Sequence, residues 1–241
     1  MKACPACGRE VEAGSSSCPY CHVIFAKHKP RKAEDLGLSS FNQDLSRTGA
    51  LVVQQQRSLT EALIGLERKN HYLVSDMDGR SLYSVEEESP FWTRQFLGSF
   101  RPLELQVVQS STSLILFRIE KPFRLWHDRV TLRDSAGRDL GSVESGFPIP
   151  VRWYTVRDTR GVTLFRISGA FWRPWTFKIF RGVVQVGEIR KKWSGLVREY
   201  FTDADNFAAT FPPEIPVAQK ALLMAALFLI DIVHFENNQS S

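Results

Sequence analysis

Several features that are common in enzymes are missing from this 241-residue sequence. It contains no G-x-S-x-G, no phosphate-binding P-loop, no dinucleotide-binding glycine pattern and no H-E-x-x-H. Its five histidines are scattered, and their spacing suggests no metal or catalytic cluster. Asp231 and His234 would share a helix face, but such pairs are more often satisfied polar groups at the end of a buried helix. We therefore expect a protein without recognisable catalytic chemistry.

Long hydrophobic runs are also missing. The longest uninterrupted apolar run, residues 221–230, is only ten residues and is followed by Asp231. A helical run of that length covers about 15 Å, whereas a bilayer crossing needs about twenty apolar residues. We expect a helix over residues 217–235 that is enclosed by protein, with single-pass membrane insertion as the less favoured alternative.

The N-terminal "MKACPACGRE" lacks the apolar segment of a secretory signal. We therefore expect a cytoplasmic, reducing location. No cysteine follows Cys21, and the four cysteines form a C-x2-C-x10-C-x2-C pattern made of Cys4, Cys7, Cys18 and Cys21. Two C-x2-C pairs joined by a Ser/Gly-rich loop suit a tetrahedral site, so we predict a structural zinc ribbon over residues 1–26. Two disulfides or a redox C-x-x-C are the alternatives, and His22 could replace one thiolate.

Positive charge is unevenly distributed. The net charge is +5, yet residues 173–198 alone contain seven Lys/Arg against one acid, Glu188. Such a strip attracts polyanions, either anionic lipid headgroups or nucleic acid. The alternative is an ordinary solvated strand face, because Lys and Arg commonly occupy exposed positions.

The middle of the chain is a series of short strands separated by turns. Hydrophobic residues make up 43% of the chain and charged residues 24%, which is typical of a globular protein. The phrase G-R-x-L-x-S-V-E occurs twice, at residues 79–86 and 137–144, each time after an Asp/Gly turn. About ten to twelve short strands at this spacing predict an antiparallel barrel or sandwich. Residues 27–47 are polar and predict a linker.

The segment "FTDADNFAATFPPEI" carries oxygen-bearing side chains at spacings that suggest calcium. If Asp203 is position 1 of a twelve-residue loop, Asp205 and Glu214 fall at positions 3 and 12. Positions 5 and 6 are Phe207 and Ala208, where an EF-hand needs an oxygen ligand and a glycine. The site would therefore bind Ca²⁺ weakly. In the alternative, the two aspartates cap turns and the phenylalanines pack inward.

A longer pattern contains this segment. "KKWSGLVREYFTDADNFAATFPPE", followed by "VAQKALLMAALFLIDIVHFE", resembles the terminal region of the phospholipid scramblase family. "LVVQQQRSLTEALIGLERKNHYLV" resembles the family's opening segment. The resemblance implies a Tubby-like domain over residues 48–236, mainly β: a closed antiparallel barrel of about twelve strands around the C-terminal hydrophobic helix. Residues 237–241 would be a disordered tail.

The resemblance also implies a function: calcium-responsive, bidirectional phospholipid translocation or anionic-lipid binding, at the inner face of the plasma membrane. It places the calcium loop at Asp203, Asp205, Asn206, Phe207, Phe211 and Glu214, and an anionic-ligand strip at Arg190, Lys191, Lys192 and Trp193. The alternative is a soluble phosphoinositide- or nucleic-acid-binding module without transport, its ribbon recruiting a protein or nucleic acid. Animal members carry a palmitoylated cysteine cluster, and the lack of cysteine after Cys21 excludes that mode of anchoring here.

Overall fold

The structure is a computed structural model. It describes residues 2–4, 9–12, 18–20, 31–32, 44–56, 71–88, 102–124, 127–146, 151–170, 172–173, 175–191 and 206–234. Near the N-terminus, β1 (Lys2–Ala3) and β2 (Glu10–Val11) pair antiparallel, and β3 (Arg31–Lys32) pairs parallel with β8 (Leu114–Lys121). The predicted tail, residues 237–241, lies outside the described residues.

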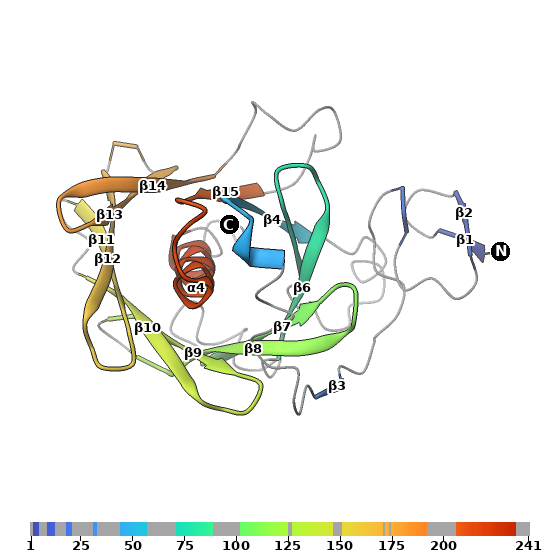
Figure 1. Ribbon diagram of the computed structural model, residues 1–241, viewed down its shortest axis with the longest axis horizontal. Coiled ribbons are helices and arrows are strands. Elements are labelled where there is room, and N and C mark those ends of the chain that lie inside the picture. Colours follow the sequence, from blue (N-terminus) through green and yellow to red (C-terminus); the bar gives the residue numbers. More distant parts are fainter. Residues whose placement is uncertain are drawn as a thin grey trace.

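Strands β4 to β15 form a closed antiparallel barrel (Figure 1). They are β4 (Ala50–Gln56), β5 (His71–Ser75), β6 (Ser81–Glu87), β7 (Leu103–Gln109), β8 (Leu114–Lys121), β9 (Arg129–Asp134), β10 (Asp139–Ser145), β11 (Val151–Arg157), β12 (Thr163–Ala170), β13 (Thr176–Arg181), β14 (Val184–Lys191) and β15 (Asn206–Thr210). Strand β15 lies between β4 and β14, and pairing of β8 with β9 completes the ring. The expected twelve-strand barrel is confirmed.

Alternation of side chains explains why these segments form a barrel wall. In β12, Phe165 and Ile167 are buried while Arg166 between them is exposed. The same alternation recurs in β13, where Phe177 and Ile179 are buried. Because successive strand residues point to opposite faces, each such strand places its apolar set inside the barrel.

Three hairpins turn through the same D-x-x-G sequence. In each, the aspartate carboxylate accepts hydrogen bonds from the backbone N–H groups two and four residues later. The glycine has a φ of 80–82°, the left-handed region that glycine adopts without strain. The pairs are Asp76 with Gly79, Asp134 with Gly137, and Asp158 with Gly161. The G-R-x-L-x-S-V-E repeat thus marks two copies of one hairpin design.

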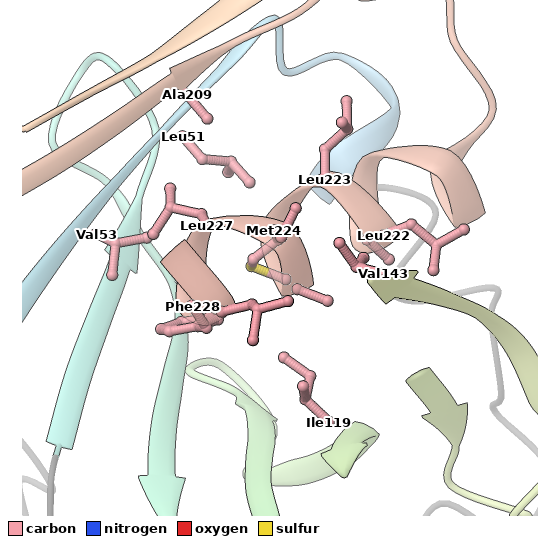
Figure 2. Close-up of a cluster of buried hydrophobic side chains, with 14 of the residues drawn as sticks. Leu51, Val53, Ile119, Val143, Ala209, Leu222, Leu223, Met224, Leu227 and Phe228 are labelled. Atoms are coloured by element: carbon pink, nitrogen blue, oxygen red, sulfur yellow. The ribbon is translucent and has the colours of Figure 1, made fainter. Parts of the chain in front are cut away.

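The C-terminal helix α4 (Val217–His234) fills the barrel (Figure 1). Every residue from Ala221 to Ile230 is at most 1% exposed. Figure 2 shows side chains of this helix, including Leu227 and Phe228, among core residues from the surrounding strands, including Val53 and Ile119. A helix that is apolar on all sides needs such an enclosure. The expected central helix is confirmed, and none of the described helices is both long and apolar enough to cross a bilayer.

The barrel has two ends that the antiparallel pairing distinguishes. We call the first the turn end: it carries the turns at 76–80, 110–113, 135–138, 158–162 and 182–183. Leu45, within the segment predicted as linker, is fully buried in the barrel core, so packing begins before residue 48. The helix α4 starts at the turn end, where Arg181 donates a hydrogen bond to the side chain of Gln219 at 2.7 Å.

Candidate functional site

Two of the four predicted zinc ligands lie in the described residues. Cys4 follows β1 and Cys18 precedes a turn, and both are buried together with Val11. The backbone N–H of Cys4 donates to the carbonyl of Arg9 at 2.8 Å, so Cys4 lies beside the start of the segment that leads into β2. Cys7 and Cys21 lie outside the described residues. The structure thus brings together one cysteine from each C-x2-C pair, and the zinc site stays a prediction.

The predicted calcium loop contains a strand. Asn206 and Phe207 begin β15, which is hydrogen-bonded to β4 on one side and β14 on the other. Asp203 and Asp205 lie outside the described residues. Residues 203–214 therefore cannot form one continuous EF-hand-like loop, because five of them belong to the barrel wall.

Asn206 is a described residue of this segment whose side chain could bind a cation. Its side chain is 7% exposed, and its amide oxygen Oδ1 has no hydrogen-bond partner in the described part of the chain. Buried polar atoms are nearly always satisfied, so an unpaired one calls for a ligand or water. An amide oxygen is a common Ca²⁺ ligand. The candidate cation site therefore lies at the start of β15, directly after Asp205.

Phe211 and Glu214 lie at the other end of that strand. The five residues of β15 cover about 13 Å at the usual rise per residue. Phe211 is buried, with the Nζ of Lys220 5.7 Å from its ring centroid. Burial lowers the pKa of Lys220, and the negative charge of Glu214 opposes that shift, which places Glu214 near the turn end. The structure thus separates Glu214 from Asn206.

The predicted anionic-ligand strip is divided by strand alternation. Arg190 is exposed on the outer wall and forms an ion pair with Glu188 at 2.8 Å. Lys191 points the other way: it is 9% exposed, and its Nζ lies 5.2 Å from the ring centroid of Phe207 and 5.8 Å from that of Trp175. Lys192 and Trp193 lie outside the described residues. Of the described pair, only Arg190 can meet a ligand at the surface.

The positive charge extends over four neighbouring strands. Residues 151–191, which contain β11 to β14, include nine Lys/Arg and two acids, Asp158 and Glu188, a net charge of +7. The whole chain has a net charge of +5, so the remaining residues sum to −2. This side of the barrel is therefore its polyanion-attracting side.

Sequence reasoning did not single out Lys220. Its ammonium is fully buried at the start of α4 and donates hydrogen bonds to three backbone carbonyls, those of Leu45 at 2.8 Å, Ser46 at 3.0 Å and Thr48 at 2.9 Å. The available signal was a lysine placed directly before a ten-residue apolar run. The acceptors could not be guessed, because they are backbone atoms more than 170 positions away.

Comparison with known proteins covers the barrel and its helix. Residues 36–237 match the family model described as Scramblase. The chain is 29% identical over 206 residues to phospholipid scramblase 2 of Bos taurus, covering 80% of this chain and 70% of the relative. It is 28% identical over 210 residues to phospholipid scramblase 1 of Homo sapiens, covering 81% and 66%. It is also 25% identical over 208 residues to phospholipid scramblase family member 5 of Homo sapiens, covering 80% and 76%.

Proposed function

Because this chain belongs to the Scramblase family, we propose that it binds phospholipid bilayers and moves phospholipids between the two leaflets in both directions. The observation that carries this proposal is the extent of the match, which spans the complete barrel and α4. Relatives named phospholipid scramblase align with 80–81% of this chain. The unit common to the family is therefore the folded domain described above.

The charge distribution supports binding to anionic lipid. A net charge of +7 on residues 151–191 would attract the negative cytoplasmic leaflet, and each Lys or Arg near such a surface contributes about 1 kcal/mol. The protein would then act in the cytoplasm, held peripherally at the inner face of the plasma membrane.

We further propose that Ca²⁺ binds at the start of β15. Asp203 and Asp205 would supply carboxylates and Asn206 its unpaired amide oxygen. Phe207 and Phe211 would contribute packing and no ligand atoms, since both are buried hydrophobic side chains. Among the described residues no group of three or more His, Cys, Asp or Glu could hold a metal, so the proposal depends on both aspartates. With so few carboxylates, the affinity would be low, in the range of about 10⁻⁴–10⁻³ M.

The N-terminal module is proposed to be a structural zinc ribbon. Cys4 and Cys18 are buried together, and Cys7 and Cys21 would complete four thiolates. A closed tetrahedral site leaves no open coordination position, so the ion would hold the fold and take no part in transport. Metal analysis of the purified protein should find about one zinc per chain, and the Cys4→Ser variant should lose it. Stoichiometric zinc in that variant would exclude this ligand set.

The transport proposal is tested with full-length protein in liposomes that contain a fluorescent phospholipid. A membrane-impermeant quencher added outside bleaches half of the signal if lipids stay in their leaflet, and more if they exchange. We expect calcium-stimulated exchange, reduced by Asp203→Ala or Asp205→Ala. If liposomes that contain the protein exchange lipid no faster than protein-free liposomes at any calcium concentration, the transport proposal is wrong.

A second function, anionic-ligand binding without transport, is favoured by the same +7 charge. It predicts salt-sensitive binding to phosphoinositide vesicles or nucleic acid that is weakened by Arg190→Glu and Lys192→Glu. The liposome experiment distinguishes the two functions, because only the first predicts leaflet exchange.

A further inference from the structure

The two ends of the barrel differ in what they expose. The five hairpin turns that the structure describes in full lie at the turn end. The strand registers show which strand termini lie at the opposite end. They are the end of β8, the end of β10, the start of β11, the end of β12 and the start of β13. We call this end the aromatic end, because four exposed aromatic side chains lie there or within two residues of it: Phe123, Trp153, Trp172 and Trp175.

These four side chains are unusually open to solvent. Trp172 is 75% exposed, Trp175 50%, Phe123 48% and Trp153 44%. Within the described barrel residues, no other aromatic side chain reaches this degree of exposure, and the exposed hydrophobic residues of the turn end are Val162, Val183 and Val184. Several exposed aromatic residues at the same end of a domain suggest an interaction surface, since single exposed apolar residues are normally scattered.

The backbone holds the aromatic side chains in place. Trp172 and Trp175 lie on the connection between β12 and β13, where the N–H of Arg173 donates to Ala170 at 2.9 Å and that of Thr176 donates to Arg173 at 3.2 Å. The carbonyl of Trp175 also accepts the N–H of Lys191 at 2.9 Å. Two exposed tryptophans therefore project from a hydrogen-bonded turn.

The charges beside these residues suit a negative partner. On the strands that lead to the aromatic end, the carboxylates of Asp128, Glu144 and Glu188 are each paired with a lysine or arginine. Arg124 and Arg173, next to Phe123 and Trp172 in the sequence, are exposed and have no ion pair in the described part of the chain. The surface therefore offers apolar rings together with unneutralised guanidinium groups.

That combination matches the interface of an anionic bilayer. Indole rings concentrate at the headgroup level of membranes, where their apolar body is buried and their N–H stays hydrated. Arginines beside them gain from the negative surface potential of the leaflet. Residues on several different strands at one end of a barrel can all touch a flat surface at the same time.

We propose that the aromatic end, through Phe123, Trp153, Trp172, Trp175, Arg124 and Arg173, is the face that docks on an anionic phospholipid bilayer. The inference rests on the proposed function, because it names the part of the protein that meets the membrane. It also orients the domain. Helix α4 starts at the turn end and ends toward the aromatic end, where its Phe228 contacts Tyr72 of β5 at 5.1 Å between ring centroids. Asn206, at the start of β15, lies at the same end.

The test compares the two barrel ends in the full-length protein. Binding is measured by co-sedimentation with phosphatidylcholine vesicles, with and without phosphatidylserine. Trp172→Ala combined with Trp175→Ala should weaken binding to the anionic vesicles by about tenfold per tryptophan removed. The matched control, Val183→Ala with Val184→Ala, removes comparably exposed residues, 94% and 62%, from the turn end and should bind like the unmodified protein.

Charge reversal provides a second comparison. Arg173→Glu should weaken binding by an order of magnitude or more, because about fivefold is lost for each unit of charge near the surface. Arg160→Glu, a highly exposed position in the 158–162 turn, should have little effect. Brominated phospholipids should quench tryptophan fluorescence of the unmodified protein, and this quenching should be reduced in the double tryptophan variant, with Trp153 accounting for part of what remains. Thermal unfolding of each variant checks that the fold is intact.

Each outcome decides the proposal. Normal vesicle binding by the aromatic-end variants, or loss of binding only in the turn-end variants, would overturn the assignment of this face while leaving the proposed function intact. If the aromatic-end variants bind a single-stranded oligonucleotide more weakly than the unmodified protein but bind vesicles normally, the surface is assigned to nucleic acid instead. If the unmodified protein binds neither vesicle and exchanges no lipid, the proposed function fails as well.

Discussion

The ammonium of Lys220 donates a hydrogen bond to the backbone carbonyl of Leu45 at 2.8 Å, although 175 positions separate the two residues in the sequence. Two more carbonyls, of Ser46 and Thr48, use its remaining donors. One buried cation thereby connects the segment that enters the barrel to the helix that fills it. Since all three donors are used, the charge is buried without an unsatisfied N–H.

Replacing this lysine should destabilise the barrel. Lys220→Met keeps roughly the side-chain length but removes all three hydrogen bonds that the buried ammonium donates to backbone carbonyls, so we expect a loss of about 3 kcal/mol in the free energy of unfolding. Urea denaturation measures it. Lys178→Met is the matched control, because Lys178 is exposed on β13 and should tolerate the change. Equal stability of the two variants would show that the Lys220 hydrogen bonds contribute nothing.

The contact between β14 and β15 depends on Gly187. A Cβ atom at this position would overlap the backbone carbonyl oxygen of Thr210 on the neighbouring strand. Gly187→Ala should therefore force the two strands apart and cost about 1–3 kcal/mol. Thermal unfolding should reveal the loss, whereas Val183→Ala in the adjacent turn should leave the midpoint unchanged. An unaltered midpoint for Gly187→Ala would mean that the strands can shift without cost.

Stability should fall in acid partly because of Asp134. Burial of this carboxyl would raise its pKa, but hydrogen bonds from Arg138 and Ala136 outweigh burial and lower the pKa below its ordinary value. A depressed folded-state pKa contributes stability above the unfolded pKa of about 3.9, which is lost as the pH falls through the folded value. We expect the loss of stability between about pH 5 and pH 2 to be smaller in Asp134→Asn.

Urea titrations across that pH range measure this contribution. Asp78→Asn is the control, because the Asp78 carboxylate, unlike that of Asp134, accepts no hydrogen bond in the described residues. Only the backbone N–H of Asp78 takes part in its turn, where it donates to Asp76. It should keep the pH dependence of the unmodified protein. If the free energy of unfolding falls equally with pH in Asp134→Asn and in the unmodified protein, the Asp134 carboxylate does not make this contribution.

Calcium binding should depend on only one end of β15. Asp205→Ala and Asn206→Ala should each weaken Ca²⁺ binding in a calorimetric titration of the full-length chain. Asn206 supplies the amide oxygen that is unpaired among the described residues, and Asp205 is its neighbour in the sequence. Glu214→Ala should bind Ca²⁺ normally, since β15 separates Glu214 from that oxygen. Loss of binding in Glu214→Ala with retention in Asp205→Ala would reverse this placement of the site.

Much of the fold was predictable because it is written in local patterns. Period-two alternation in segments such as 163–170, and D-x-x-G turns such as 134–137, are properties of neighbouring residues, so they predict strands and hairpins without any long-range information. The ten-residue apolar run after Lys220 likewise predicts a helix enclosed by protein. The closed twelve-strand barrel and the threaded helix followed from the resemblance of the terminal pattern.

The candidate site was predicted less completely. A twelve-residue spacing placed Glu214 in one loop with Asp203, but residues 206–210 pair with two neighbouring strands. A run of four neighbours, Arg190 to Trp193, suggested a common surface, yet strand alternation exposes Arg190 and turns Lys191 toward aromatic rings. Spacing along the chain cannot reveal these separations, because they depend on which strand each residue joins.

The amino-acid sequence by itself determined the elements of this protein: its strands, its D-x-x-G turns, its buried helix and the excess of positive charge in residues 151–191. Tertiary structure alone decided which residues meet. It joined Lys220 to Leu45, left the amide oxygen of Asn206 unpaired among the described residues, and gathered the exposed tryptophans at one end of the barrel. The physical reason is that strand identity depends on neighbouring residues, whereas contacts depend on the register and closure of a sheet formed by segments far apart in the chain.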